Sequence, residues 1–385
     1  MFIQLHALTS YPSALLNRDD VGFAKTLPFG GTTRTRVSSQ CLKYHWRKHD
    51  GDMSLSEVDV PMAIRSRQIF PRLVAGKLSA AEPHAAAAAY TLQRFIVDGS
   101  SPTKKEVKGL LQSDSPLEML SSDKKYKLTQ PIVLGPAEVD HLLSEARKLC
   151  KRADGSDDEI KVFADADLDK KQMKVLSSGL DAALFGRMAT SEVLSQTNAA
   201  LHVAHAFTVH AQEQETDYFA VVDDLTSAEG EKGSSHLNSK ELTSGLYYSY
   251  VAVDVPLLTS NLNEDPQIAA EVMRRFVHIM ATVSPGAKLS STAPHSRARC
   301  LIAETGDGQP RTLANAFRDA VPQAGAVQKS YEALDHYVRQ MDNMYSTEQE
   351  RRAAGIDLPE SFVGAEQTTV PEIAEWASEQ ITSAQ

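Results

Sequence analysis

The sequence predicts an α+β fold, because strand-forming and helix-forming residues occupy separate stretches of the chain. The first residues alternate apolar with polar side chains, which is typical of a strand. Residues 52–150 are mainly helix-forming, and a β-rich section follows at residues 201–255. Separate blocks of strands and helices are typical of α+β proteins.

The N-terminal section combines a strand, a long loop and a helix. Residues 2–8 form the first predicted strand. Residues 9–33 run through Ser, Pro, Asn, Asp and Gly, so we expect a long loop with a functional role. Residues 34–39 follow as a short strand or turn, and Ser39 is the expected N-cap of a helix that reaches Lys48.

The section from residue 52 to residue 150 is predicted to be mainly helical. Residues 80–95 carry a run of five alanines, which strongly favours a helix. Residues 136–151 begin with proline, place acids early and bases late, and space their apolar residues on one face. Residues 112–131, rich in Ser, Asp, Pro and Lys, are expected to form a loop between these helices.

The section after residue 200 begins with strands. Residues 201–211 alternate apolar with polar side chains, and residues 218–222 and 246–255 are β-branched and aromatic. A stretch rich in Gly and Ser at residues 228–239 lies between the last two. We therefore predict a long hairpin arm with a flexible tip.

The C-terminal section is predicted to contain three helices and then an acidic tail. The helices are expected at residues 267–283, 313–321 and 331–341. Residues 341–385 hold nine acids and two bases, which suggests an acidic tail with one weak helix around residues 373–381.

The composition is that of a globular protein with a net acidic charge. The chain has 385 residues, a formal net charge of −10 and 42% hydrophobic residues. Its three cysteines are far apart, which argues against a disulfide framework or a zinc site and fits a reducing cytoplasm. The sequence has no phosphate-loop or dinucleotide motif, no apolar run long enough to span a membrane and no signal-peptide pattern. We therefore expect a cytoplasmic protein with no cofactor, no metal and no membrane partner.

Positive charge is concentrated in residues 18–48 of this acidic chain. Seven lysines and arginines and only two aspartates lie in this stretch. Paired glycines let a polyanion approach the backbone, arginines bind phosphate through two donors at a time, and free amides before a helix also favour phosphate. The predicted phosphate-binding residues are Arg18, Gly30, Gly31, Arg34, Arg36, Ser38, Ser39, Gln40, Lys43 and Arg47.

Two sets of residues leave alternatives open. Asp19 and Asp20 could carry acid–base chemistry on RNA, or they could orient arginines and cap turns. The second interpretation is favoured because no histidine or metal set accompanies them in sequence. Three histidines, His202, His205 and His210, form a cluster, but strand alternation places His205 on the apolar face and the other two opposite. They are therefore not expected to converge on one metal.

Several segments together resemble the CasC family, the backbone subunits that coat the guide RNA in type I-E CRISPR Cascade. The first is residues 16–20, followed by Phe29-Gly30-Gly31 and by the arginine, serine and glutamine pattern of residues 34–43. Further segments match in family order: residues 184–188, 199–208, 218–225, 244–248, 285–288 and 313–317. The resemblance covers residues 1–345, and it is specific as a set rather than in any single piece.

The resemblance implies an RRM-like (ferredoxin-like) palm with a helical fingers insertion and a β-hairpin thumb. The palm would comprise residues 1–51 and 161–345, with the thumb at about residues 215–250 within it. The fingers would be residues 52–160. Residues 346–385 would be an acidic C-terminal tail that matches nothing in the family.

The resemblance also implies roles for individual residues. The arginines, lysines, serines and glutamine of residues 34–47 would hold guide-RNA phosphates, and Lys288 in the matching segment 285–288 would join them. Met188 would pack against bases at a kink in the RNA. Phe219 and Leu237 on the thumb would wedge where a base is flipped out.

The function that the resemblance implies is a non-catalytic subunit that binds the CRISPR guide RNA (crRNA). Copies would stack head-to-tail along the guide, contact other Cascade subunits and present the guide for pairing with the target DNA strand. An alternative is a metal-dependent RNA endonuclease on the same fold that uses Asp19 or Asp20. A third interpretation is a general single-strand RNA chaperone. The type I-E-like segments favour the first.

Overall fold

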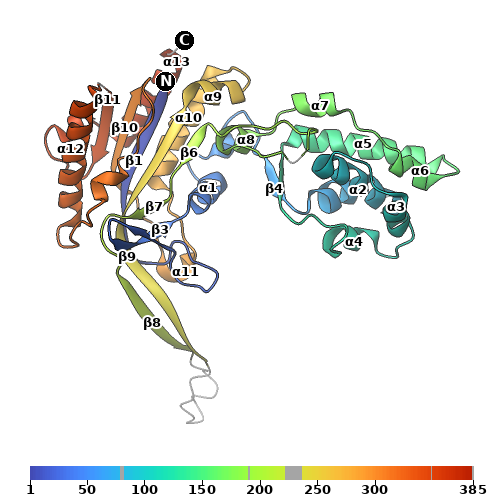
Figure 1. The fold of residues 1–385 in the computed structure, drawn as a ribbon, viewed down its shortest axis with the longest axis horizontal. Helices are drawn as coiled ribbons and strands as arrows, with labels where there is room; N and C mark the ends of the chain where they lie inside the picture. Colours follow the sequence, from blue (N-terminus) through green and yellow to red (C-terminus); the bar gives the residue numbers. More distant parts are fainter. Residues whose placement is uncertain (79–81, 190, 222–235, 348, 384–385) are drawn as a thin grey trace, which may run out of the picture. The chain divides into compact units, whose positions relative to one another are not determined.

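The chain folds into two compact units, both with helices and strands. The structure is a computed structural model that describes residues 1–78, 82–189, 191–221, 236–347 and 349–383. Unit 1 comprises residues 1–57, 201–259 and 265–385, and unit 2 comprises residues 58–200 and 260–264. The predicted α+β class is confirmed (Figure 1).

The boundary between the units differs from the one that the resemblance implies. Residues 161–200, expected in the palm, belong to unit 2. Phe163, Met173 and Val193 are fully buried in the hydrophobic core of that unit, and this burial holds the segment there.

A ten-stranded sheet forms the framework of unit 1. Its strand order is β12-β11-β10-β1-β9-β7-β3-β2, and β6 and β8 also pair with β9. All of these pairs are antiparallel except β11 with β12. The strands are β1 (Phe2–Ala14), β2 (Thr26–Phe29), β3 (Thr32–Val37), β6 (Leu201–Val203), β7 (Ala206–Thr208), β8 (Gln214–Val221), β9 (His236–Asp254), β10 (Ala298–Gly306), β11 (Glu350–Gly355) and β12 (Glu366–Gln367).

The central strand β1 is longer than the sequence predicts. The expected strand ends at residue 8, where the apolar pattern ends. β1 continues to Ala14 because β9 continues to pair with it, for example Tyr11 with Gly245 and Ala14 with Thr243. The predicted loop at residues 9–33 is therefore shorter, and it also contains β2 and the start of β3.

The predicted hairpin arm corresponds to β8 and the first half of β9 (Figure 1). The register runs from Gln214 opposite Thr243 to Val221 opposite His236. Most of the predicted tip, residues 228–239, lies outside the described residues.

Helices complete unit 1. They are α1 (Ser39–Lys48), α9 (Val255–Asn261), α10 (Pro266–Thr282), α11 (Leu289–Thr292), α12 (Ala326–Tyr345) and α13 (Val370–Ser383), with 3₁₀ turns at Leu55–Glu57, Ala314–Phe317 and Phe362–Gly364. The helix predicted at residues 313–321 is only one of these short turns. Phe317 on this turn is fully buried, so the segment is fixed by packing rather than by helical hydrogen bonds.

Residues 349–383 belong to unit 1 and do not form a separate acidic tail. β11 pairs with β10, and α13 packs along α10. Ile373, Trp376 and Ile381 of α13 are buried, because apolar residues recur on one face of this helix. The acids that dominate the composition, such as Glu372 and Glu375, lie on its exposed face.

Unit 2 is a helical body with a two-stranded sheet. Its elements are β4 (Ile64–Ser66), a π-helical segment (Ile69–Ala75), a 3₁₀ turn (Gly76–Leu78), α2 (Glu82–Asp98), α3 (Lys104–Leu111), α4 (Pro116–Ser122), β5 (Ile132–Leu134), α5 (Pro136–Asp154), α6 (Glu159–Ala164), α7 (Lys170–Val175) and α8 (Leu180–Phe185). The alanine run of α2 is buried, so neighbouring elements approach its backbone closely. The predicted loop at residues 112–131 contains α4, whose Pro116 starts a short helix.

Candidate nucleic-acid interface

The two glycines of the basic segment form the turn between β2 and β3. Phe29 pairs with Thr32, and Gly30 and Gly31 connect them with φ angles of +59° and +79°. Such a two-residue turn needs positive φ at both positions, which glycine adopts without steric cost. A Cβ atom on Gly30 would lie 1.5 Å from the carbonyl oxygen of Arg318, whereas one on Gly31 would meet nothing within 4 Å. Gly30 is therefore required for close packing of this turn against the chain itself.

Arg34 is fully buried, which corrects its predicted phosphate contact. Its guanidinium donates to the hydroxyl of Thr32 at 2.7 Å and to the carbonyls of Thr208 and Phe317, both at 3.0 Å. The ring of Phe29 lies 5.7 Å from the guanidinium carbon. With its donors used inside the fold, Arg34 ties the β2–β3 hairpin to the segment around Phe317.

Arg36 remains at the surface. It is partly exposed, its Nε donates to the carbonyl of Thr26 at 2.9 Å, and its Nη1 donates to Nδ1 of His205 at 2.9 Å. The backbone amide of Arg36 donates to the carbonyl of Lys25 at 2.8 Å, which brings that lysine into the same region. Arg36, Lys25 and His205 therefore form one exposed basic group.

The serines form the start of α1, one residue earlier than predicted. Ser38, not Ser39, is the N-cap, and its hydroxyl accepts from the amide of Cys41 at 3.3 Å. The amide of Ser38 in turn donates to Asn17 Oδ1 at 3.0 Å. Both serines are almost buried, whereas Gln40 is exposed. Of these three predicted contacts, Gln40 presents its side chain to a ligand most directly.

Asp19 organises the loop that precedes β2. Its Oδ1 accepts from the amides of Val21, Gly22 and Phe23 at 3.0, 2.8 and 2.9 Å. This is the turn-capping role that the sequence favours. Arg18 and Asp20 on either side are exposed. Among the described residues, no group of three or more His, Cys, Asp or Glu side chains could hold a metal ion.

Loop residues 285–289 lie beside α1. The amide of Gly286 donates to His45 Nε2 at 3.4 Å, and the amide of Ala287 donates to the carbonyl of Leu15 at 2.9 Å. The predicted contact Lys288 follows directly and is partly exposed, as are Lys43 and Arg47 on α1. All three take part in interactions within the chain. The structure thus brings Lys288 to the basic segment from 240 residues away in sequence.

Exposed aromatic side chains that the sequence did not predict as binding residues accompany the positive charge. Phe23 in the loop and Tyr44 on α1 are 56% and 54% exposed. Aromatic rings beside cations are suited to stacking on nucleic-acid bases. The signal in the sequence was the presence of an aromatic residue within a basic segment. A pattern of apolar and polar residues alone would place such an aromatic residue in a hydrophobic core.

The three histidines do not follow the predicted alternation. His202 and His205 are exposed, whereas His210 is buried, with Nδ1 against the carbonyl of Ala211 at 2.7 Å and Nε2 accepting from the amide of Leu246 at 3.1 Å. The prediction is wrong for His205 and His210. The strand is interrupted between β6 and β7, so the alternation of faces is not continuous.

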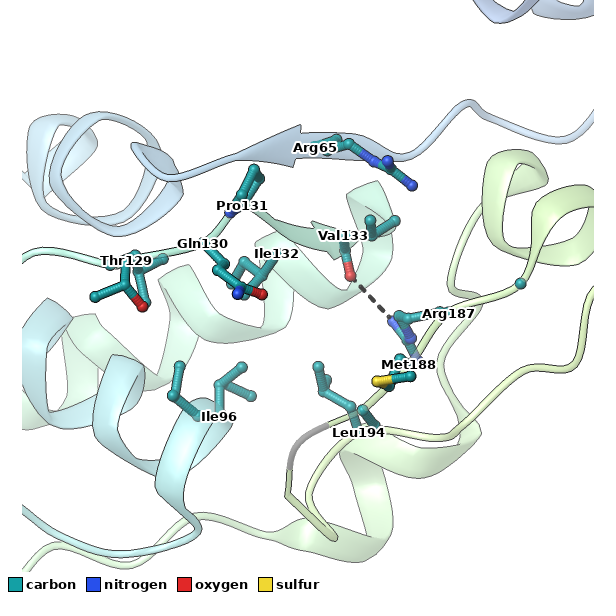
Figure 2. A pocket seen from close by; sticks show the side chains of 14 residues that line it. Arg65, Ile96, Thr129, Gln130, Pro131, Ile132, Val133, Arg187, Met188 and Leu194 are labelled. Atoms are coloured by element: carbon teal, nitrogen blue, oxygen red, sulfur yellow. Dashed lines mark hydrogen bonds between the residues drawn. The ribbon is translucent and has the colours of Figure 1, made fainter. Parts of the chain in front are cut away.

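The predicted base-packing residues lie elsewhere. Met188 belongs to unit 2, is 88% exposed and lines a cavity of about 500 Å³ with Arg65, Gln130 and other side chains. Figure 2 shows Met188 and Arg65 around this space, and Arg187 donating to the carbonyl of Val133. The backbones of Phe219 and Leu237 lie in β8 and β9, where they pair with Asn238 and Ala220. Their side chains lie outside what the structure describes.

The chain belongs to the CT1975-like protein family (Cas_CT1975), whose model matches residues 3–379. Its fold is also similar to chains of two solved structures, each described as a CRISPR RNA-guided surveillance complex. The first, in a pre-nicking state, has a TM-score of 0.75 and 23% identity over 100% of both chains. The second has a TM-score of 0.67 and 19% identity over 99% of this chain and 100% of that chain. No match was found among curated proteins.

These comparisons confirm the predicted resemblance to Cascade-type CRISPR subunits. At such low identities the structural likeness establishes the fold, and the family model carries the assignment to a family. Among the described residues, no helix is long and apolar enough to cross a membrane.

Proposed function

We propose that this chain is a non-catalytic subunit that binds a CRISPR guide RNA along its backbone in a type I-E Cascade complex. The observation that carries the proposal is the set of exposed or partly exposed basic residues Arg18, Lys25 and Arg36 in unit 1, followed by the exposed amide of Gln40 on α1. It lies on a chain whose net charge is −10 and whose family is that of CT1975-like proteins. Confined positive charge favours a single-stranded polyanion over general coating of nucleic acid.

In this proposal unit 1 includes the RRM-like palm and the β8–β9 thumb, and unit 2 is the fingers. Copies of the chain bind head-to-tail along the guide and contact other Cascade subunits in the cytoplasm. Contacts to phosphates leave the Watson–Crick edges of the guide free, so base pairing with the target DNA strand supplies sequence recognition.

The non-catalytic role is supported by the contacts of Asp19. Three backbone amides converge on one of its carboxylate oxygens, which is a geometry for holding a loop. Asp20 is exposed and remains the residue on which an endonuclease alternative would depend. Incubation of single-stranded RNA with the protein and Mg²⁺ or Mn²⁺ should give no cleavage. Specific cuts that disappear in Asp20→Ala would favour the endonuclease.

The central experiment is to identify the RNA that co-purifies with the protein expressed with its CRISPR array and partner subunits. We expect uniform short RNAs that carry repeat sequence. An Arg18→Glu/Arg36→Glu variant should lose this RNA, whereas Arg339→Glu, on an exposed position of α12, should retain it. Binding of the purified protein to single-stranded RNA should also weaken steeply with salt and depend little on sequence. Salt-independent binding, or a heterogeneous RNA population, would contradict the proposal.

A further inference from the structure

Arg36 is an arginine with an unusual partner. Arginines elsewhere in the chain, such as Arg187 and Arg351, are paired with buried carboxylates. Among the described residues, Arg36 has no carboxylate within ion-pair distance, and its side chain donates instead to the carbonyl of Thr26 and to His205. Neutral acceptors therefore hold the guanidinium in place, and no carboxylate among the described residues neutralises its charge.

The contact with Arg36 fixes the tautomer of His205. A guanidinium can only donate hydrogen bonds, so the 2.9 Å contact requires Nδ1 of His205 to accept. The imidazole proton of the neutral ring must then be on Nε2. His205 is exposed, so this N–H remains available as a second donor beside the arginine.

The surroundings of His205 favour the neutral imidazole. Burial of part of the ring lowers the pKa of His205 below its ordinary value, and the positive charges of Arg36 on β3 and Lys25 in the preceding loop lower it further. Both charged groups that act on this histidine are cations. The neutral form is the one that the Arg36 contact requires, because a proton on Nδ1 would remove the acceptor.

We propose that Arg36 and His205 form one phosphate-binding clamp, in which the guanidinium and the Nε2–H of the imidazole bind the same phosphodiester group of the RNA. Lys25 lies close enough to act on His205 electrostatically, and it adds positive charge to the same site. The clamp rests on the proposed function, because it assigns a second donor to the RNA-binding surface.

Loss of the pairing on acidification is the signature of this clamp. As the pH falls through the lowered pKa of His205, Nδ1 gains a proton and can no longer accept from Arg36. The coupling between the two side chains in RNA binding should therefore be present at pH 8.0 and disappear at lower pH. Two independent contacts would show no coupling at either pH.

The test is the affinity of a short fluorescein-labelled single-stranded RNA, measured by anisotropy between pH 5.5 and pH 8.0 at constant salt. His205→Gln should bind RNA more weakly than wild type at pH 8.0, where the imidazole is neutral and accepts from Arg36. The matched control is His336→Gln, an exposed histidine on α12, which should retain the wild-type profile.

A double-mutant cycle separates the clamp from independent contacts. Arg36→Gln and His205→Gln should each weaken binding, and the combined variant should lose less than the product of the two separate effects. If His205→Gln keeps both the wild-type affinity and its pH profile, the clamp is overturned while RNA binding by the chain stands. If the wild-type protein binds no RNA at any pH, the proposed function itself fails, and the clamp fails with it.

Discussion

The guanidinium of Arg34 donates to the backbone carbonyl of Phe317 at 3.0 Å, and neither side chain has any exposed surface. Arg36, two residues later on the same strand, is partly exposed and contacts His205. The two arginines of this short basic segment therefore have different roles. Arg34 stabilises the fold, and Arg36 is available at the surface.

Replacement of these two arginines should separate stability from RNA binding. Arg34→Ala leaves the buried carbonyls of Thr208 and Phe317 without donors, at ~1–3 kcal/mol each, so the free energy of unfolding should fall by about 2–6 kcal/mol. Arg36→Ala should change it by about 1 kcal/mol or less but weaken RNA affinity. Denaturant unfolding and RNA titration of both variants check this. Equal destabilisation by the two changes would contradict the assigned roles.

The glycines of the β2–β3 turn should differ in their tolerance of a side chain. Gly31→Ala has free space and should cost about 1–2 kcal/mol for its positive φ alone. Gly30→Ala adds a collision with the Arg318 carbonyl, so it should lower the melting temperature considerably more. The two variants control for each other, because both remove a turn glycine. A Gly30→Ala protein as stable as Gly31→Ala would show that the turn moves away from Arg318 without cost.

The buried ion pair of unit 2 provides a third test. Arg187 Nη1 lies 2.8 and 2.7 Å from the two carboxylate oxygens of Glu138, and both side chains are almost completely buried. Glu138→Ala leaves a buried guanidinium without its counter-charge, so we expect a loss of about 3–5 kcal/mol. Glu138→Leu combined with Arg187→Met should recover much of it, because two apolar groups need no pairing.

Two spectroscopic signals can separate the unfolding of unit 2 from the unfolding of unit 1. Both tryptophans, Trp46 and Trp376, are buried in unit 1. Helical circular dichroism, to which both units contribute, should therefore show part of its change at a lower denaturant concentration in Glu138→Ala, while the tryptophan emission still changes at the wild-type concentration. A coincident shift of both signals would indicate that the units unfold as one.

The stability of unit 2 should depend on pH through His84. Its Nδ1 and Nε2 lie 2.7 Å from Asp154 and from Glu159, respectively. Burial lowers the pKa of His84, but hydrogen bonds and charge from the two carboxylates outweigh it, and the net pKa is raised. A raised histidine pKa stabilises the fold fully below the unfolded value of about 6.5, and the contribution is lost as the pH rises through the folded pKa.

The pH effect is measured as a difference between two proteins. Melting curves of wild type and His84→Gln by circular dichroism from pH 5 to pH 8.5 should be furthest apart at the acidic end and converge as the pH rises. The difference removes the contributions of His45, His205 and His278, whose lowered pKa values act in the opposite direction. A constant difference across this range would mean that Asp154 and Glu159 do not raise the pKa of His84.

Much of the fold could be predicted because local patterns were sufficient for it. The helix predicted at residues 136–151 is α5, since its proline start and apolar face are local signals. The structure of the C-terminal residues was harder to predict, because composition gives the number of acids but not the face of the helix on which they lie. Ile373 and Trp376 bury one face of α13 and leave Glu375 exposed, which an acid count does not reveal.

The candidate site shows the same division between local and distant information. The sequence by itself determined where positive charge is concentrated, which segments resemble a family and that glycines form a turn before a helix. Only the tertiary structure decided which of these groups reach solvent. Phe317 and Arg318 come from nearly 300 residues away to accept from Arg34, and His205 comes from beyond unit 2 to meet Arg36. Exposure of a side chain depends on what distant segments cover it, and no local pattern in residues 18–48 contains that information.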